Sequence, residues 1–395
     1  MEMKIFEEIE IKKIDTASIS QEYLLMHGGA FFQISEMLAN LINSIKKNNL
    51  NLETALIDFN KQNDRKLSRK NFEEIINQIL LPILNSHDKN QSLNSFKFRN
   101  TIVAAHRLSP ITRILKHLFN PYLIYVLVSI SLLFSVVFLI TDNTITTITS
   151  LQSSLFIGLL FFLSVIFHEL GHASACKYYN IEHGDIGFAV YFYFPVFYAD
   201  VSQAWTLERK QRLIIDFGGI YFQLVFLIPI FIISFITNSE SINLLIYSIL
   251  ISFLFDINPF FKFDGYWFVS DLLGIPNLRQ KTNEIPRFLI AKFLKKSQTK
   301  KPFLFSLREK EKYFFISYVI LVNIFFVYIF FYRIPILLYS FFQTIPSQIA
   351  EIYALLSVNS MPLDKIMFLV IQIAMFLLIV FVIYNALKRL LGYKF

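Results

Sequence analysis

Two histidines and a glutamate stand together where a long apolar run of the chain meets its first charges. His168, Glu169 and His172 follow the apolar run 151–167 and form the pattern His-Glu-x-x-His. Side chains four residues apart lie above one another on a helix, so both imidazoles can bind the same zinc ion. The glutamate between them can take a proton from a water that the zinc activates. The spacing therefore predicts metal-assisted hydrolysis on a helix that crosses a membrane.

The composition independently indicates a membrane protein. Of the 395 residues, 55% are hydrophobic and 17% are aromatic, which is too apolar for a soluble globular chain. The single cysteine, Cys176, excludes an intrachain disulfide, and its helical spacing from the histidines favours packing over metal binding. The first twenty residues are charged and lack the apolar centre of a signal peptide, so we expect entry into the membrane through an internal span.

Six apolar segments approach the length of about 20 residues that a helix needs to cross a bilayer. The fourth is short, and its apolar character resumes in 259–273, where Lys262 and Asp264 interrupt it. Such an interruption is expected where polar groups line a cavity enclosed by protein. A further stretch, 335–345, is too short to cross and is assigned to the membrane interface. The predicted spans are 122–140, 151–176, 213–237, 242–257, 314–334 and 366–386.

Lysine and arginine set the predicted orientation. The connections 141–150 and 238–241 contain neither residue, whereas 279–312 is densely basic. By the positive-inside rule, both termini and the histidine end of the second span face the cytoplasm. The net charge of +8 then reflects membrane topology. Nucleic-acid binding is not expected, because no basic and aromatic residues interleave on one folded face.

The histidine pair needs a third ligand, and one downstream segment offers a carboxylate for it. This is the aromatic segment Asp-Ile-Asn-Pro-Phe-Phe-Lys-Phe-Asp-Gly-Tyr-Trp, at 256–267. A carboxylate among aromatic residues at bilayer depth is costly unless it binds a cation or pairs. Three protein ligands would leave a catalytic zinc its open fourth position.

These motifs together resemble a known family. HELGH on one span, followed by a proline five residues before Asp-Gly on a later span, resembles the site-2 protease family of intramembrane zinc metallopeptidases. HELGHASACKYY, FPVFYADVSQAW and NPFFKFDGYWFVSDLLGIPNL are similar to its peptide zinc metalloprotease branch, which accompanies bacterial peptide-modification and export systems. The resemblance is strong over roughly 111–278 and loose over the last two spans.

The resemblance implies a role for each residue of the site. His168, His172 and Asp264 would be Zn²⁺ ligands, and Glu169 would be the general base. The family has an asparagine eight residues before the aspartate that helps to hold the substrate or its oxyanion. This chain has Asp256 there and Asn258 two residues later. A carboxylate donates no hydrogen bond unless it is protonated, so either residue stays a candidate for that role.

An aromatic segment at 187–205 favours β-structure, because β-branched and aromatic residues alternate in it and Pro195 disfavours a helix. In site-2 proteases the equivalent stretch dips into the membrane near the zinc and pairs with an unwound substrate strand. Such pairing satisfies the backbone groups that unwinding exposes. Gly218 and Gly219 on the third span favour close helix packing.

The first part of the chain, 1–85, reads as a soluble domain. A hairpin is expected over 22–34, with its turn at Gly28 and Gly29, followed by three helices with Ser35, Asn51 and Ser68 as N-caps. This order suits a small winged-helix-like unit, and it resembles the leader-recognition element of enzymes that mature ribosomally made peptides. Those elements bind a leader as an added strand.

The predicted fold class is mainly α, a polytopic membrane protein with about six transmembrane helices, a membrane-dipping β-rich segment and an N-terminal α+β domain. Its organisation would be a peptide-recognition domain in 1–85, a linker and interfacial helix in 86–120, a catalytic transmembrane core in 121–278, a basic cytoplasmic loop in 279–313 and C-terminal transmembrane helices in 314–395.

Several polar residues have simpler interpretations. His183 is expected at the membrane interface, and Asp216 is expected to cap a helix or pair with Arg212.

The leading function is hydrolysis of a peptide bond in a small precursor, in the bilayer, with a peptide-modifying enzyme or an ABC exporter as partner. Two alternatives are proteolysis of a membrane-bound regulator and a zinc-bearing scaffold that cleaves nothing. The first alternative commonly needs a periplasmic substrate filter, and 238–241 is too short to hold one.

Overall fold

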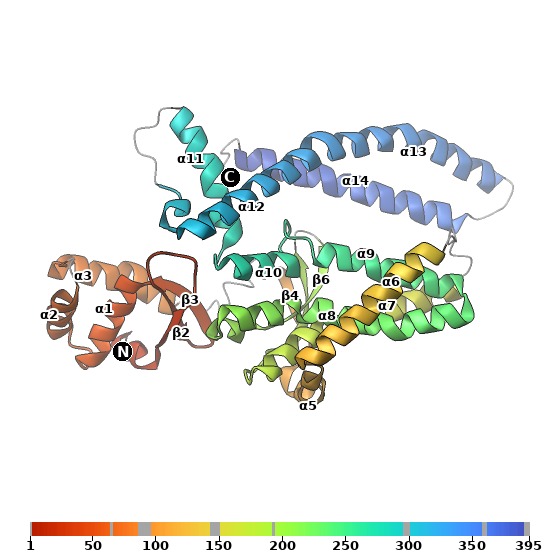
Figure 1. The fold of residues 1–395 in the computed structure, drawn as a ribbon. Coiled ribbons are helices and arrows are strands. Elements are labelled where there is room, and N and C mark those ends of the chain that lie inside the picture. Colours follow the sequence, from red (N-terminus) through yellow and green to blue (C-terminus); the bar gives the residue numbers. More distant parts are fainter. Residues whose placement is uncertain are drawn as a thin grey trace. The chain divides into compact units, whose positions relative to one another are not determined.

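The computed structural model describes residues 2–63, 66–85, 96–142, 151–191, 194–294, 301–357 and 362–390. It divides into two compact units, Met1–Phe315 and Ile316–Phe395 (Figure 1). Residues 86–95 of the predicted linker and residues 143–150 of the connection between the first two predicted spans lie outside the described residues. The finer division into five parts therefore remains a prediction.

The chain begins with a small sheet and a set of short helices. After the turn η1 (Glu2–Glu8), strands β1 (Glu10–Ile14), β2 (Glu22–His27) and β3 (Ala30–Ser35) form an antiparallel sheet in that order. The predicted hairpin is β2–β3, and both turn glycines adopt positive φ. The sequence analysis missed β1, because its polar side chains carry little apolar alternation. The helices that follow are α1 (Glu36–Lys47), α2 (Leu52–Gln62), α3 (Arg69–Ile75), η2 (Ile76–Leu80) and α4 (Leu81–Asn85).

The three predicted caps of these helices are confirmed. The Ser35 hydroxyl accepts the backbone N–H of Leu38, and Ser68 does the same for Asn71. The Asn51 side chain accepts two N–H groups of the first turn of α2. Each cap satisfies donors that the helix itself leaves unpaired. The apolar faces then meet in one core, which includes Phe6, Phe32, Ile42, Phe59 and Phe72.

A second sheet lies beside the apolar helices. Its strands are β4 (Phe96–Val103), β5 (Ile186–Tyr191) and β6 (Phe194–Ala199), antiparallel and in that order. The β-structure predicted over 187–205 is confirmed in β5 and β6, whereas Ser202–Thr206 form a 3-10 helix. β4 was predicted to be part of a polar linker and an interfacial segment. Only its pairing with β5, far along the chain, makes β4 a strand. β6 is an edge strand, which is where a proline such as Pro195 is tolerated.

The rest of the first unit is helical. Its helices carry several of the apolar segments noted in the sequence. The elements are α5 (Ala105–Leu115), η4 (Lys116–Phe119), α6 (Pro121–Thr141), α7 (Leu151–Tyr178), η5 (Ser202–Thr206), α8 (Arg209–Thr237), α9 (Glu240–Asp256), α10 (Asp264–Leu273), α11 (Leu278–Phe293) and η6 (Phe303–Ser306).

The second unit contains a long hairpin of helices. α12 (Glu309–Tyr328), which begins in the first unit, continues through the π-helical turn η7 (Ile329–Arg333) into α13 (Ile334–Ser357), and α14 (Leu363–Leu390) follows. Phe341 of α13 stacks on Phe376 of α14 with ring centroids 4.2 Å apart. The interfacial stretch expected at 335–345 is instead part of this helix, which widens to a π-helical turn just before Pro335.

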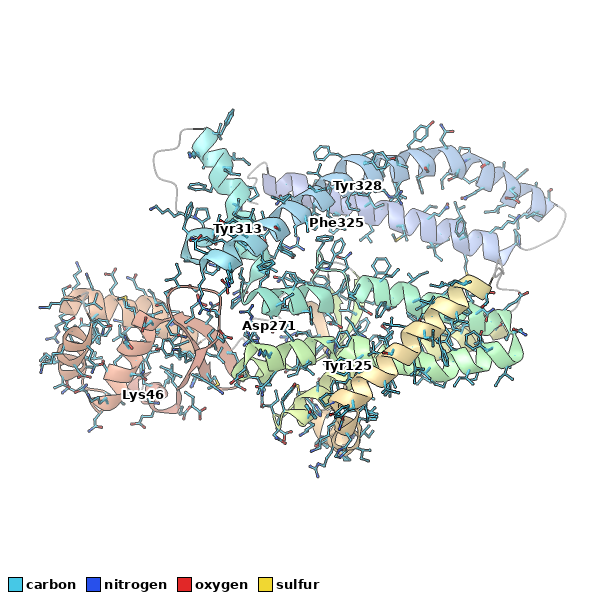
Figure 2. The ribbon with its side chains drawn as sticks, in the orientation of Figure 1. Lys46, Tyr125, Asp271, Tyr313, Phe325 and Tyr328 are labelled. Carbon is cyan, nitrogen blue, oxygen red and sulfur yellow. The ribbon has the colours of Figure 1, made fainter. Side chains whose placement is uncertain are left out.

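Among the described residues, five helices are long and apolar enough to cross a membrane. Many of their large side chains are exposed, among them Tyr125 on α6 and Tyr328 on α12 (Figure 2), which are 74% and 46% exposed. The fourth predicted span, 242–257, corresponds to α9, a helix of 17 residues, and its crossing remains a prediction. The five are Pro121–Thr141, Ser153–Tyr178, Arg209–Thr237, Glu309–Ser357 and Lys365–Asn385.

The backbones of α7 and α8 touch at a pair of glycines. A Cβ atom added at Gly171 would lie 2.2 Å from the carbonyl oxygen of Gly218, and one added at Gly218 would lie 3.0 Å from that of Gly171. No side chain fits at this crossing unless the helices move apart. The packing role expected of Gly218 is therefore visible in the structure.

We predict that Gly171→Ala lowers the stability of the protein, because the added methyl must push α8 away. Overpacking of this kind costs about 1–3 kcal/mol. The measurement is the thermal unfolding midpoint of the purified protein in detergent. The control is Gly158→Ala on the same helix, where an added Cβ meets no atom within 4 Å. Equal midpoints for the two variants would contradict the close contact.

Candidate metal centre

Three side chains from two helices converge on one point. His168 and His172 project from the same face of α7, with their Nε2 atoms 3.3 Å apart. α10 begins at Asp264, whose Oδ2 lies 2.8 Å from Nε2 of His168 and 3.2 Å from Nε2 of His172. The structure thus brings the three predicted ligands together, although Asp264 is 92 residues from His172.

The spacing of these donor atoms fits a single zinc ion. Ligand atoms about 2.0–2.1 Å from a tetrahedral zinc lie about 3.3 Å from one another. The three atoms observed are separated by 2.8, 3.2 and 3.3 Å. Among the residues that the structure describes, these three form a group of histidine and carboxylate side chains able to hold a metal.

Groups behind the imidazoles set their orientation. Nδ1 of His172 donates a hydrogen bond to the carbonyl oxygen of Ile215 on α8, at 2.7 Å, which leaves its Nε2 as a lone-pair donor. Nδ1 of His168 faces Oδ2 of Asp256 at 3.9 Å. A carboxylate behind a ligating histidine is a common partner in zinc sites. The structure therefore places Asp256 beside a metal ligand as well as along the cavity wall.

A glycine below the two histidines leaves room for their ring nitrogens. A Cβ atom at Gly219 would lie 2.4 Å from Nε2 of both His168 and His172. Any side chain at this position of α8 would occupy the space where the donor atoms meet. The second glycine of the pair thus serves the site rather than helix packing alone.

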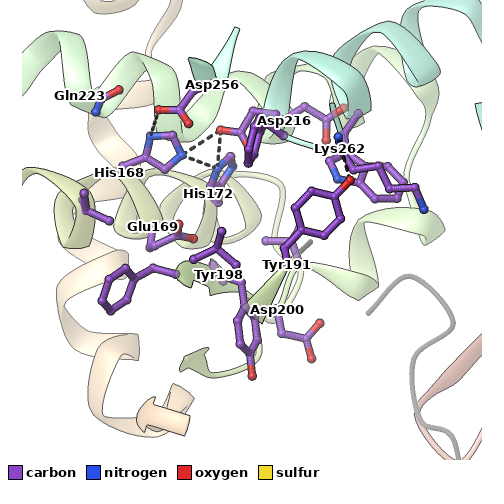
Figure 3. Close-up of a pocket in the computed structure, with 18 of the residues that line it drawn as sticks. His168, Glu169, His172, Tyr191, Tyr198, Asp200, Asp216, Gln223, Asp256 and Lys262 are labelled. Atoms are coloured by element: carbon purple, nitrogen blue, oxygen red, sulfur yellow. Dashed lines mark hydrogen bonds and ion pairs between the residues drawn. The ribbon is translucent and has the colours of Figure 1, made fainter. Parts of the chain in front are cut away.

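Glu169 lies between the histidines and the second sheet. Its side chain is 7% exposed and is hydrogen-bonded by the backbone of Ala199, at the end of β6. A cavity of about 520 Å³ runs from the metal-binding side chains along β6 and includes Tyr198, Trp205 and Gln223 in its wall. The carboxylate of Glu169 thus faces the cavity next to the edge of a strand (Figure 3).

The far end of α10 is fixed to α8. Arg209 donates from Nε to the carbonyl oxygen of Asp271 at 2.6 Å, and Arg212 binds the Asp271 carboxylate through Nε and Nη2, both at 2.9 Å. Cations at a helix C-terminus also interact favourably with its dipole. Because α8 holds this end, the Asp264 end of α10 is directed toward α7.

The expected pairing of Asp216 with Arg212 is wrong. Arg212 is 3% exposed and pairs with Asp271, which reaches it from α10. Asp216 lines the large cavity, and its Oδ2 is buried without a hydrogen-bond partner. Neighbours along one helix are visible in a sequence, whereas a partner from another helix is not.

The structure also locates three other residues considered in the sequence analysis. Asn258 lies in the turn after α9, where its side-chain oxygen accepts the N–H of Phe260 at 2.8 Å, and it is not among the described residues that line the large cavity. His183 is buried, and its Nε2 lies 3.0 Å from the hydroxyl oxygen of Thr112 on α5, so its position at the membrane interface stays a prediction. Cys176 is fully buried, as packing requires.

Comparison with known proteins gives one informative similarity. No family model matches the chain, and no solved structure does. A curated relative is 26% identical over 130 residues, 32% of this chain and 52% of the relative. It is named "Putative peptide zinc metalloprotease protein YydH" and comes from Bacillus subtilis (strain 168). The chain spans about half the length of this relative, and the similarity supports a zinc metalloprotease.

We predict that Asp264→Asn weakens zinc binding more than a hundredfold, because an amide is a poor zinc ligand, while Asp256→Asn weakens it about tenfold through His168. Affinity would be measured by competition with a chromophoric chelator. The control is Glu182→Gln, an exposed carboxylate near the end of α7 that is outside the site. Zinc binding by Asp264→Asn as tight as that of the unchanged protein would remove Asp264 from the ligand set.

Proposed function

We propose that this protein is an intramembrane zinc metalloendopeptidase of the site-2 protease type. The observation that carries the proposal is the approach of Asp264 Oδ2 to both imidazoles, at 2.8 and 3.2 Å, inside a bundle of apolar helices. Two histidines and one carboxylate are the ligand set of a catalytic zinc that keeps a fourth position open. The named relative and the His-Glu-x-x-His spacing support the same chemistry.

Each residue of the site has a chemical task in this proposal. When bound, the zinc ion supplies Lewis acidity that polarises the peptide carbonyl and makes a water more acidic. Glu169 accepts a proton from the attacking water and passes it to the leaving amine. Ile215 and Asp256 hold the imidazoles with their Nε2 atoms toward Asp264.

The edge strand β6 offers a place for the substrate. Its residues Pro195 to Ala199 line the cavity beside Glu169, and no strand of the described sheet covers its outer edge. A transmembrane substrate must unwind before it can be cut, and the freed backbone groups need new hydrogen bonds within the membrane. A peptide added along β6 would regain them and would bring its carbonyl toward Glu169.

The sheet near the N-terminus supports a proposal on the class of substrate. β3 is one of the two edge strands of the first sheet, and α1 follows it directly. We propose that a leader peptide pairs with β3, so that the precursor of a ribosomally made peptide is cut during its maturation or export. A peptide-modifying enzyme or an ABC exporter would then be the partner. The enzyme would lie in the bacterial inner membrane with both termini in the cytoplasm, since the basic residues gather on that side.

We predict that Glu169→Gln lowers cleavage of a candidate precursor peptide by about a hundredfold to ten-thousandfold, because an amide accepts no proton. Zinc content should stay unchanged, since Glu169 is outside the ligand set. Cleavage would be followed by mass spectrometry after co-expression of the protein with that precursor. Glu182→Gln is the matched control. Equal processing by Glu169→Gln and the unchanged protein would remove the peptidase proposal.

We predict that a synthetic leader from the same precursor slows amide exchange in β3 about tenfold when its concentration is ten times the dissociation constant. Hydrogen–deuterium exchange on the full-length protein would be the measurement, with a leader of scrambled sequence as the control. Cleavage of the precursor with no added protection in β3 would reject the leader proposal while leaving the peptidase intact.

A further inference from the structure

A second cavity, of about 310 Å³, lies between the turn before α10 and the first half of α11. We call it the basic cavity. Three of the residues that line it are cations and the other four are polar and uncharged, and no carboxylate lines it within the described part of the chain. The lining residues are Lys262, Tyr266, Asn277, Arg279, Gln280, Asn283 and Arg287.

Two cations come close together in this cavity. Lys262, from the turn before α10, and Arg279, from the first turn of α11, both belong to its lining. The hydroxyl oxygen of Tyr266 accepts the backbone N–H of Arg279 at 2.9 Å, which leaves its O–H as a donor. Two cations held together among hydrogen-bond donors are stabilised by an anion.

The surface of α11 continues from polar to apolar beyond the cavity. Arg279, Asn283 and Arg287 recur every four residues and so lie along one side of the helix. Ile290 and Phe293 extend this side in the second half, and they are 59% and 86% exposed. A basic patch that runs into exposed large apolar side chains is typical of a surface that meets a bilayer.

We propose that the basic cavity binds the phosphate headgroup of an anionic phospholipid, with the acyl chains along Ile290 and Phe293. Basic cavities next to membrane helices commonly hold such headgroups. Lys262 also lines the cavity of the metal centre, so the lipid would lie next to the peptide-binding space. The lipid site does not depend on peptide hydrolysis.

The test uses full-length protein purified in neutral detergent and incubated with phosphatidylglycerol or phosphatidylcholine of identical acyl chains. Native mass spectrometry counts the lipid that each protein retains. We expect phosphatidylglycerol to be preferred and Arg287→Gln to weaken its retention about fivefold, the effect of one cation near a lipid surface. Arg287→Lys should restore retention, because it keeps the charge.

The matched control is Lys292→Gln, which removes the same charge from the same helix five residues further on, outside the lining of the basic cavity. Its retention should equal that of the unchanged protein. An equal loss in Arg287→Gln and Lys292→Gln would overturn the site, as would equal retention of the two lipids. Displacement of phosphatidylglycerol by an equal concentration of inorganic phosphate would assign the cavity to a free anion and reject the lipid.

Discussion

The metal centre depends on how closely α7 and α8 approach each other. At Gly171 and Gly218 the two backbones are in contact, and one residue further along α8, Gly219 leaves space for both imidazole rings. The carbonyl of Ile215 on the same helix orients His172. A larger residue at any of the glycine positions would separate the helices or fill the space where the donor atoms meet. One helix crossing therefore provides stability, ligand orientation and room for a metal.

α10 completes the site because both of its ends are held. Its first residue, Asp264, meets the histidines, and its last turn is bound by Arg209 and Arg212 of α8. The residue after the helix, Gly274, accepts a backbone hydrogen bond from Ala17 at 2.8 Å. The short connection between β1 and β2 therefore touches the element that carries the third ligand. The buried Arg212 and Asp271 pair with each other, which offsets the cost of burying their charges among apolar helices.

The two cavities differ in the charges that line them. The charged groups of the larger one are mainly carboxylates, among them Glu169 and Asp216, and also include Arg212, whereas the charged groups of the basic cavity are all cations. Lys262 belongs to both. A peptide bound along β6 and a phosphate bound beside α11 would then be neighbours on opposite sides of one lysine, each facing groups that suit its own chemistry.

The sequence predicts those features of the protein that depend on spacing between nearby residues. The histidine pair follows from helical pitch, the caps of the first helices from residue type, and the apolar spans from composition. Asp264 was found through a motif, and its approach to the histidines needed the folded chain. Only the tertiary structure decided the pairing of β4 with β5, the partner of Arg212 and the place of Asp256 behind His168. These contacts join segments far apart along the chain, where no periodicity records which side chains will meet.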